Sequence, residues 1–262
     1  MTSINNNINN TPQESNTTYY YKRRSPIASD VGVLAATVAT GLIYKALPSF
    51  SNPFLKQITK EHANNHIYKD AFLKAIENSK LEEKGLKLIH TEHPETSYGQ
   101  GLNACFSPQT KEIILNTKKA CISGFHELGH AINNMGSGIG KIMQKLRGPG
   151  YTVAAIMGSV ALFTRTKPKE AEKNLFDIVQ DNCGKIAFIS MLPTVIEEAM
   201  ASKKGIDMAK RAGLGESAIK NLRKFYGKAL LSYAGYAALT GFSVFVTSKI
   251  MEIFTRPKKV SI

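Results

Sequence analysis

Cysteine is scarce in this chain, and its copies are widely spaced. Only three occur among 262 residues, Cys105, Cys121 and Cys183, and no Cys-x-x-Cys pair is present. This pattern indicates neither a disulfide framework nor a thiolate zinc site. It is typical of a protein from a reducing compartment.

Acidic residues are also few, with 20 Asp and Glu against 34 Lys and Arg, which gives a net charge of +14. Such an excess suits nucleic acid, an anionic membrane surface or the flanks of membrane helices. The chain lacks an RNA-binding aromatic motif, a zinc finger and a recognizable recognition helix. We therefore expect the lipid bilayer as a partner, and no nucleic acid. A basic adaptor of membranes or nucleic acid remains an alternative that rests on charge alone.

Residues 1–28 are rich in Asn, Ser and Thr and lack the apolar side chains of a core. We expect this tail to be disordered. No apolar run begins near Met1, so the sequence does not predict a signal peptide.

Four long apolar segments occur further along the chain. Ala229–Ser248 has twenty residues without a charge, which is the length that a bilayer core requires. Val31–Phe50 carries only Lys45. Tyr151–Thr164 and Ile186–Ile196 are shorter, the second is interrupted by Pro193, and both are equally compatible with buried soluble helices.

These segments predict membrane helices over residues 29–50 and 229–250, with candidate membrane-embedded helices near 149–165 and 184–196. Residues 51–228 form the remaining domain, and residues 251–262 a basic tail. Lys and Arg flank nearly every apolar segment, so the positive-inside rule leaves the orientation open.

The stretch Phe125–Ala131 reads FHELGHA and contains the pattern H-E-x-x-H. Apolar spacing predicts a helix over Thr117–Met135, capped by Asn116 or Thr117. On this helix His126 and His130 lie one turn apart on one face, where they can bind one zinc ion. Glu127 lies beside them, where it can act as general base toward water.

Two neighbouring segments support a catalytic interpretation. Lys111–Asn116 reads as a strand, and an edge strand beside a zinc helix can bind an extended peptide. Ile196–Ile206 reads as a helix that carries Glu197 and Glu198, two candidates for a third zinc ligand.

The other histidines have weaker signals. His62 and His66 share the four-residue spacing but lack the intervening glutamate, and they are interpreted as an exposed helix face. His90 and His93 lie in a predicted loop.

Three blocks together resemble the membrane gluzincins of the HtpX heat-shock protease and CAAX prenyl endopeptidase family, metallopeptidase family forty-eight, which includes the OMA-type mitochondrial protease. The blocks are LNACFSPQTKEIILNTKKA, FHELGHAINN and EEAMASKKGIDMAKRAGL, and the likeness covers Leu102–Leu214.

The resemblance implies one Zn²⁺ bound by His126, His130 and Glu198, with Glu127 as the catalytic base. Glu198 is preferred over Glu197 because it begins the family's E-x-x-A-D-like register. Where the family register usually has an Asp, this chain has Ser202. In the family, that Asp resembles a partner residue that orients one of the zinc-binding histidines.

The same resemblance implies a substrate-binding segment, to which we assign Asn103, Ala104, Ile113 and Leu115. No residue matches a motif for stabilising the transition state. The candidates for that role are Tyr226, Tyr233, His90 and His93.

We therefore expect a mainly α protein with a small β-sheet (α+β), built as a zincin-like metalloprotease core with membrane-spanning helices. The expected function is a zinc endopeptidase integral to the cell (inner) membrane, acting on polypeptides that include membrane proteins. The alternative is a catalytically inactive zinc-binding membrane scaffold. Ser202 favours that alternative and the intact Glu127 argues against it.

Overall fold

The computed structural model describes residues 19–22, 24–45, 65–92, 104–136, 138–163 and 172–261. Its helices are α1 (Pro26–Tyr44), α3 (Asn65–Ser79), η1 (Glu82–Lys84), α4 (Cys121–Met135), α5 (Ile139–Phe163), α6 (Leu175–Asp181), α7 (Cys183–Arg211) and α8 (Glu216–Thr255). Its strands are β1 (Tyr19–Lys22), β2 (Lys87–His90), β3 (Ala104–Ser107), β4 (Glu112–Leu115) and β5 (Lys258–Ser261). The predicted mainly helical α+β class is confirmed.

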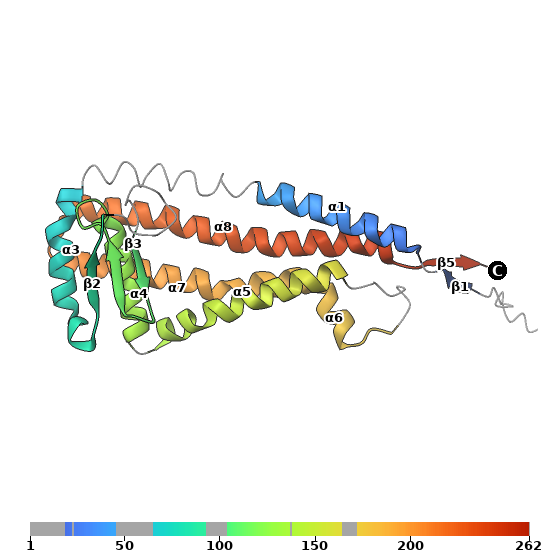
Figure 1. The fold of residues 1–262 in the computed structure, drawn as a ribbon, viewed down its shortest axis with the longest axis horizontal. Helices are drawn as coiled ribbons and strands as arrows, with labels where there is room; N and C mark the ends of the chain where they lie inside the picture. The colour runs from blue at the N-terminus through green and yellow to red at the C-terminus, as the bar shows by residue number, and fades with distance from the viewer. Residues whose placement is uncertain are drawn as a thin grey trace, which may run out of the picture.

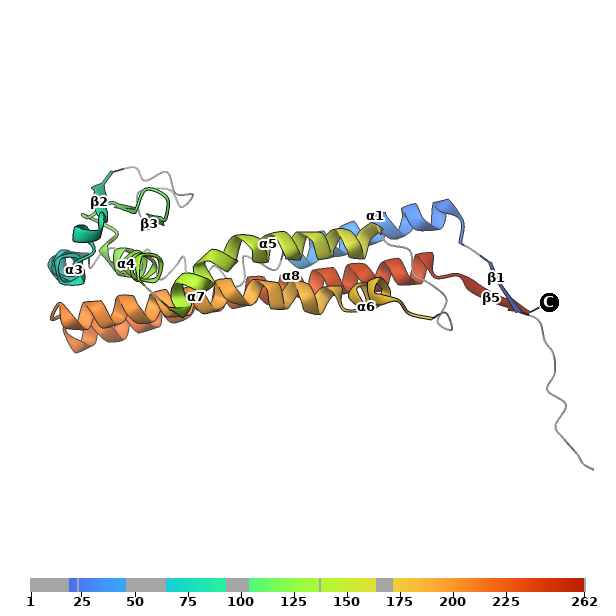
Figure 2. The ribbon, with the colours of Figure 1, turned by 90° about the horizontal axis from the view of Figure 1, so that it is seen from below.

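The molecule is elongated, with a small lobe at one end of a long helical bundle (Figure 1). The helices α3 and α4 and the three-stranded sheet form the lobe, while α1, α5 and the far halves of α7 and α8 form the bundle (Figure 2). The helices α7 and α8 extend through both parts and so connect the lobe directly to the bundle.

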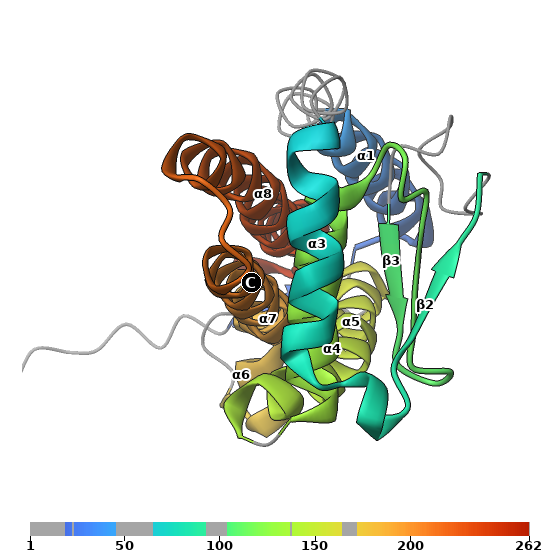
Figure 3. The same cartoon turned by 90° about the vertical axis from the view of Figure 1, so that its left-hand side faces the viewer.

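The core of the lobe forms where α3, the sheet, α7 and α8 pack around α4. Figure 3 shows α3 crossing the end of the molecule with the strands beside it. Phe72 of α3 meets Phe125 of α4 edge to face, with ring centroids 5.4 Å apart. The other large buried side chains of this core are Tyr68, Ile113, Leu115, Ile122, Leu128, Ile219, Leu222, Phe225 and Tyr226.

The prediction that Lys111–Asn116 supplies an edge strand is wrong. The strand β4 is the central one, parallel to β2 and antiparallel to β3. Ile113 and Leu115 are 0% exposed, so their side chains pack in the hydrophobic core and are not available to contact a substrate. Among the described strands β3 has the free edge beside α4, and it packs against that helix.

The helix α4 begins at Cys121, four residues later than predicted. Its cap comes from α3, because Asn65 Oδ1 accepts a hydrogen bond from the Cys121 N–H at 2.8 Å. The Asn65 Nδ2 also donates to the Thr117 carbonyl at 3.1 Å. Because this cap comes from 56 residues upstream, the local sequence does not reveal it, and the predicted start of the helix at Thr117 is therefore too early.

The bundle contains the two helices that are long and apolar enough to cross a membrane among the described residues, α1 and α8. They run antiparallel, and the hydroxyls of Thr40 and Thr247 hydrogen-bond at 3.0 Å. Large apolar side chains point outward, as Leu34 (66% exposed) and Leu231 (60%) do. The bundle therefore has an unusually apolar outer surface for a protein in water.

The two shorter apolar segments lie inside the long helices α5 and α7. Pro193 was expected to interrupt the second segment, but α7 continues through it, as α5 continues through Pro149. Small side chains such as Ala154 and Ala187 fill the contact between these helices.

The disorder predicted for residues 1–28 is wrong for its last part. The strand β1 pairs antiparallel with β5, and α1 begins at Pro26 with Ser25 as its cap. Residues 1–18 lie outside the described part of the chain. The pairing places both ends of the described chain at the far end of the bundle (Figure 2).

Two glycines let α4 and α7 touch backbone to backbone. A Cβ on Gly129 would overlap the carbonyl oxygen of Ala201, and a Cβ on Gly205 would overlap that of Phe125. Any larger residue would force the helices apart. The contact places Glu198 of α7 beside His126 of α4.

We predict that Gly129→Ala destabilises the protein by about 1–3 kcal/mol, because the added methyl group overpacks this contact. Thermal unfolding in detergent micelles measures the change. Gly41→Ala in α1 is the control, since a Cβ there meets no atom within 4 Å. Equal midpoints for the two variants would contradict the close helix contact.

Candidate metal centre

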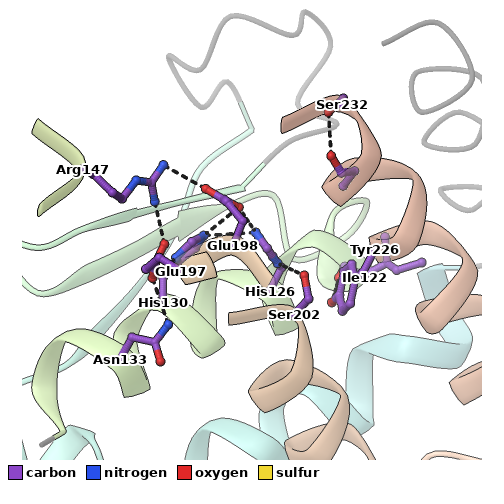
Figure 4. A network of polar contacts seen from close by, with 11 residues as sticks. Ile122, His126, His130, Asn133, Arg147, Glu197, Glu198, Ser202, Tyr226 and Ser232 are labelled. Atoms are coloured by element: carbon purple, nitrogen blue, oxygen red, sulfur yellow. Dashed lines mark hydrogen bonds and ion pairs between the residues drawn. The ribbon is translucent and has the colours of Figure 1, made fainter. Parts of the chain in front are cut away.

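Three ligand-type atoms converge between α4 and α7 (Figure 4). His126 Nε2 lies 3.0 Å from Glu198 Oε2 and 3.0 Å from His130 Nε2. The third side of the triangle, from His130 Nε2 to Glu198 Oε2, measures 3.5 Å. The structure thus brings together the three residues expected as metal ligands.

The triangle has the size that a tetrahedral zinc site needs. Zinc bonds of about 2.0–2.1 Å at tetrahedral angles place neighbouring ligand atoms about 3.3 Å apart. Glu197 lies 2.8 Å from His130 Nδ1 and accepts its hydrogen bond, so Nε2 is the ring nitrogen that faces the triangle and can bind a metal once it has lost its proton. Two imidazoles and one carboxylate are a ligand set that zinc commonly takes.

Each histidine has a partner on its second ring nitrogen. Glu197 serves His130, while Ser202 Oγ lies 3.2 Å from His126 Nδ1. The preference for Glu198 over Glu197 as ligand agrees with this geometry, because Glu197 faces the far side of the His130 ring. The serine that replaces an expected aspartate still contacts its histidine, but without a charge.

Arg147 of α5 bridges the two glutamates. One guanidinium nitrogen lies 2.8 Å from Glu197 Oε2, and the other lies 2.8 Å from Glu198 Oε1 (Figure 4). Asn133 of α4 also donates to Glu197 Oε1 at 2.9 Å. Both carboxylates are therefore fixed on the side away from the triangle, and Glu198 Oε2 is left to face the histidines.

The cluster carries excess negative charge in a buried place. Glu197 and Glu198 are 0% and 1% exposed, and Glu127 adds a third carboxylate. Arg147 supplies one compensating guanidinium, and a proton on His130 or a bound cation would offset more of the negative charge.

The pKa values reflect this excess. Burial alone would lower the pKa of His130, but hydrogen bonds to Glu197 and Glu198 outweigh it and raise the pKa to about 10. Burial would raise the pKa of Glu198, but its contacts with His126 and His130 hold it well below its usual range. In the absence of a metal these contacts favour a protonated His130, and a metal ion bound in the triangle would take the place of that proton.

Glu127 lies next to the triangle without belonging to it. Its carboxylate lies within 4.8 Å of ligand atoms of both histidines. Burial raises the pKa of Glu127, while the two histidines and a hydrogen bond from the Phe106 backbone N–H lower it. A carboxylate with an elevated pKa in this position suits a group that accepts and returns a proton.

A cavity of about 510 Å³ opens onto the two histidines, Glu127, Glu198 and Arg147. The strand β3 forms one wall with Ala104, Cys105 and Phe106, and α8 forms another. Ala104, one of the residues predicted to bind substrate, therefore lines this cavity. A cavity of this size accepts a short stretch of peptide or a small ligand.

The residues named as candidates for stabilising the transition state do not lie together. Tyr233 and Tyr226 line the cavity, but the Tyr226 hydroxyl donates to the Ile122 carbonyl at 2.6 Å and its ring packs on His126. His90 lies outside the cavity lining, with Nδ1 2.8 Å from the Thr117 hydroxyl.

Several other predicted positions fall away from the site. Ile113 and Leu115 are buried in the lobe core, as described above. His66 lies exposed on α3, as expected. Asn103, His62 and His93 lie outside the described residues.

The sequence does not single out Arg147 or Asn133 as residues of the candidate site. Arg147 lies in the basic part of α5, where it looks like an ordinary flanking charge of an apolar segment. Asn133 follows His130 by three residues on α4, so helical spacing was a weak signal for a polar partner on that face.

Comparisons of this chain with protein-family models, with curated proteins and with solved structures found no match.

We predict that Arg147→Met lowers the affinity for zinc by roughly 10- to 100-fold, because Glu197 and Glu198 lose the group that orients them. Competition with a chelating dye measures the affinity. Arg147→Lys is expected to recover only part of it, since an ammonium cannot bridge both carboxylates as a guanidinium does.

The control is Arg211→Met at the exposed end of α7, which removes the same charge outside the cluster. A loss of similar size in both variants would show that only the overall charge matters.

Proposed function

We propose that this protein is a membrane-bound zinc endopeptidase. The observation that carries the proposal is the convergence of His126, His130 and Glu198 on one point, with Glu127 beside it inside an open cavity. A purely structural metal site would not require a further carboxylate, one that is not itself a ligand, beside its open side. The resemblance of three sequence blocks to the HtpX and CAAX endopeptidase family supports the same function.

His126, His130 and Glu198 would hold the zinc ion. Bound there, zinc would supply Lewis-acid activation of water and of a peptide carbonyl. Glu127 accepts the proton of the attacking water on its carboxylate and then delivers it to the leaving amine. Glu197 and Ser202 keep the two imidazole rings oriented during these steps.

The strand β3 is the element suited to align a peptide. Its outer edge has no partner among the described strands, and its residues form one wall of the cavity. An extended substrate can add to such an edge by main-chain hydrogen bonds. This role replaces the one expected for β4.

Membrane placement is supported by composition and by the outer surface. The helices α1 and α8 are long and apolar enough to span a bilayer. Exposed apolar side chains also occur on α5 and α7, for instance Ile156 (50% exposed) and Ile189 (59%). The cavity includes Ala229, the first residue of the uncharged part of α8, so it lies at the level where the apolar bundle begins.

We predict that Glu127→Gln abolishes cleavage of an unfolded model protein, while the zinc content stays near one per chain. The amide keeps the shape of the side chain but cannot take a proton, and loss of a general base lowers rates by about 10²–10⁴-fold. Cleavage in detergent and metal analysis of the same preparations measure both quantities.

Glu198→Ala is the companion variant, expected to lose both zinc and cleavage. If wild type and Glu127→Gln both bind zinc and neither cleaves any of a panel of unfolded substrates, the catalytically inactive scaffold is the better description. Absence of zinc binding by the wild type would contradict both functions.

We further predict that Glu197→Gln weakens zinc binding more than Ser202→Ala does. The first change removes a charged partner of His130 and the second a neutral partner of His126. Charge-assisted hydrogen bonds are about twice as strong as neutral ones. Chelator competition compares the two variants, and the reverse order would contradict the assigned orientation of the rings.

A further inference from the structure

A second pocket, of about 370 Å³, lies between α7 and α8 directly behind the metal centre. Ser202 and Tyr226 form part of its wall. Both side chains also contact the His126 ring, Ser202 by its hydroxyl and Tyr226 by ring packing. The pocket is thus separated from the metal ligands by a single layer of side chains.

Its lining is basic at one end. Lys203 and Lys210 of α7 and Arg223 of α8 are exposed side chains at the pocket, and Asp207 is the acidic residue that lines it. None of the three cations takes part in an ion pair within the described ranges. Three unpaired cations around one concave site favour a ligand with concentrated negative charge.

The other end of the pocket is apolar and faces the bundle. Ala199 and Leu230 line it there. Lys203 follows Ala199 by one helical turn of α7, about 6 Å along the helix, so the charged and apolar parts of the pocket adjoin each other. Leu230 lies just inside the uncharged part of α8 that starts at Ala229.

We propose that this pocket binds the phosphate of an anionic membrane lipid. Lys203 and Arg223 contact the phosphate, and the first carbons of the acyl chains lie over Leu230. Basic pockets between membrane helices commonly bind phosphorylated lipid headgroups. Charge at one end and apolar surface at the other favour a lipid over free phosphate. The proposal rests on the proposed membrane placement, but not on peptidase activity.

The test measures lipid binding by the full-length protein in dodecyl maltoside micelles, using native mass spectrometry. Dioleoyl phosphatidylglycerol is titrated against dioleoyl phosphatidylcholine, which has the same chains and no net charge. Inorganic phosphate at millimolar concentration forms a third arm. We expect one saturable phosphatidylglycerol site, with at least a roughly tenfold preference over phosphatidylcholine.

The double variant Lys203→Gln/Arg223→Gln is expected to weaken that site roughly tenfold or more. Lys203→Arg/Arg223→Lys keeps both charges and retains binding, which shows that the positions tolerate substitution. The matched control is Lys220→Gln/Lys224→Gln, which removes two exposed cations of α8 outside the pocket. We expect this control to bind as the wild type does.

Equal losses in the pocket variant and the control would overturn the proposal in favour of diffuse charge attraction. Equal affinity for the two lipids would overturn it as well. Displacement of phosphatidylglycerol by millimolar phosphate would reassign the pocket to a soluble phosphate ligand. Because binding is read directly, these outcomes do not depend on whether the protein cleaves peptides.

Discussion

The close contact of α4 with α7 is the constraint on which the candidate metal centre depends. Gly129 and Gly205 remove the side chains that would otherwise separate the two backbones. This close approach of the two helix backbones lets side chains from different helices meet, as His126 and Glu198 do at 3.0 Å. The glycine within H-E-L-G-H is therefore a packing residue, and the histidines on either side of it owe their position to it.

The contact is reinforced by charge. The carboxylates that follow each other on α7 have separate tasks, since Glu198 faces the triangle and Glu197 faces the back of the His130 ring. Arg147 of a third helix contacts both carboxylates, so α5 connects the bundle to the candidate metal centre. Burying this much charge is unfavourable unless every group has a partner. A cation bound in the triangle would complete that set of partners.

The local parts of the site could be predicted from the sequence, whereas the parts that depend on tertiary contact could not. Helical spacing alone places His126 and His130 on one face, with Glu127 beside them. The central position of β4 was missed because its parallel partner β2 lies well before it in the chain, whereas β3 is joined to β4 by a short turn. An apolar run such as Ile113–Leu115 reads alike at an edge or in the centre of a sheet. The Asn65 cap and the Arg147 bridge were missed for the same reason, because each acts on a helix distant in the chain.

The pairing of β1 with β5 has a consequence for how the chain would lie across a bilayer. It fastens the start of α1 to the end of α8, and these antiparallel helices meet along their length. With both helices across a membrane, β1 and β5 would share one compartment, and the lobe with its cavity would face the opposite one. A label inserted beside β1 or β5 would therefore report the compartment opposite to the one that the cavity and the candidate metal centre face.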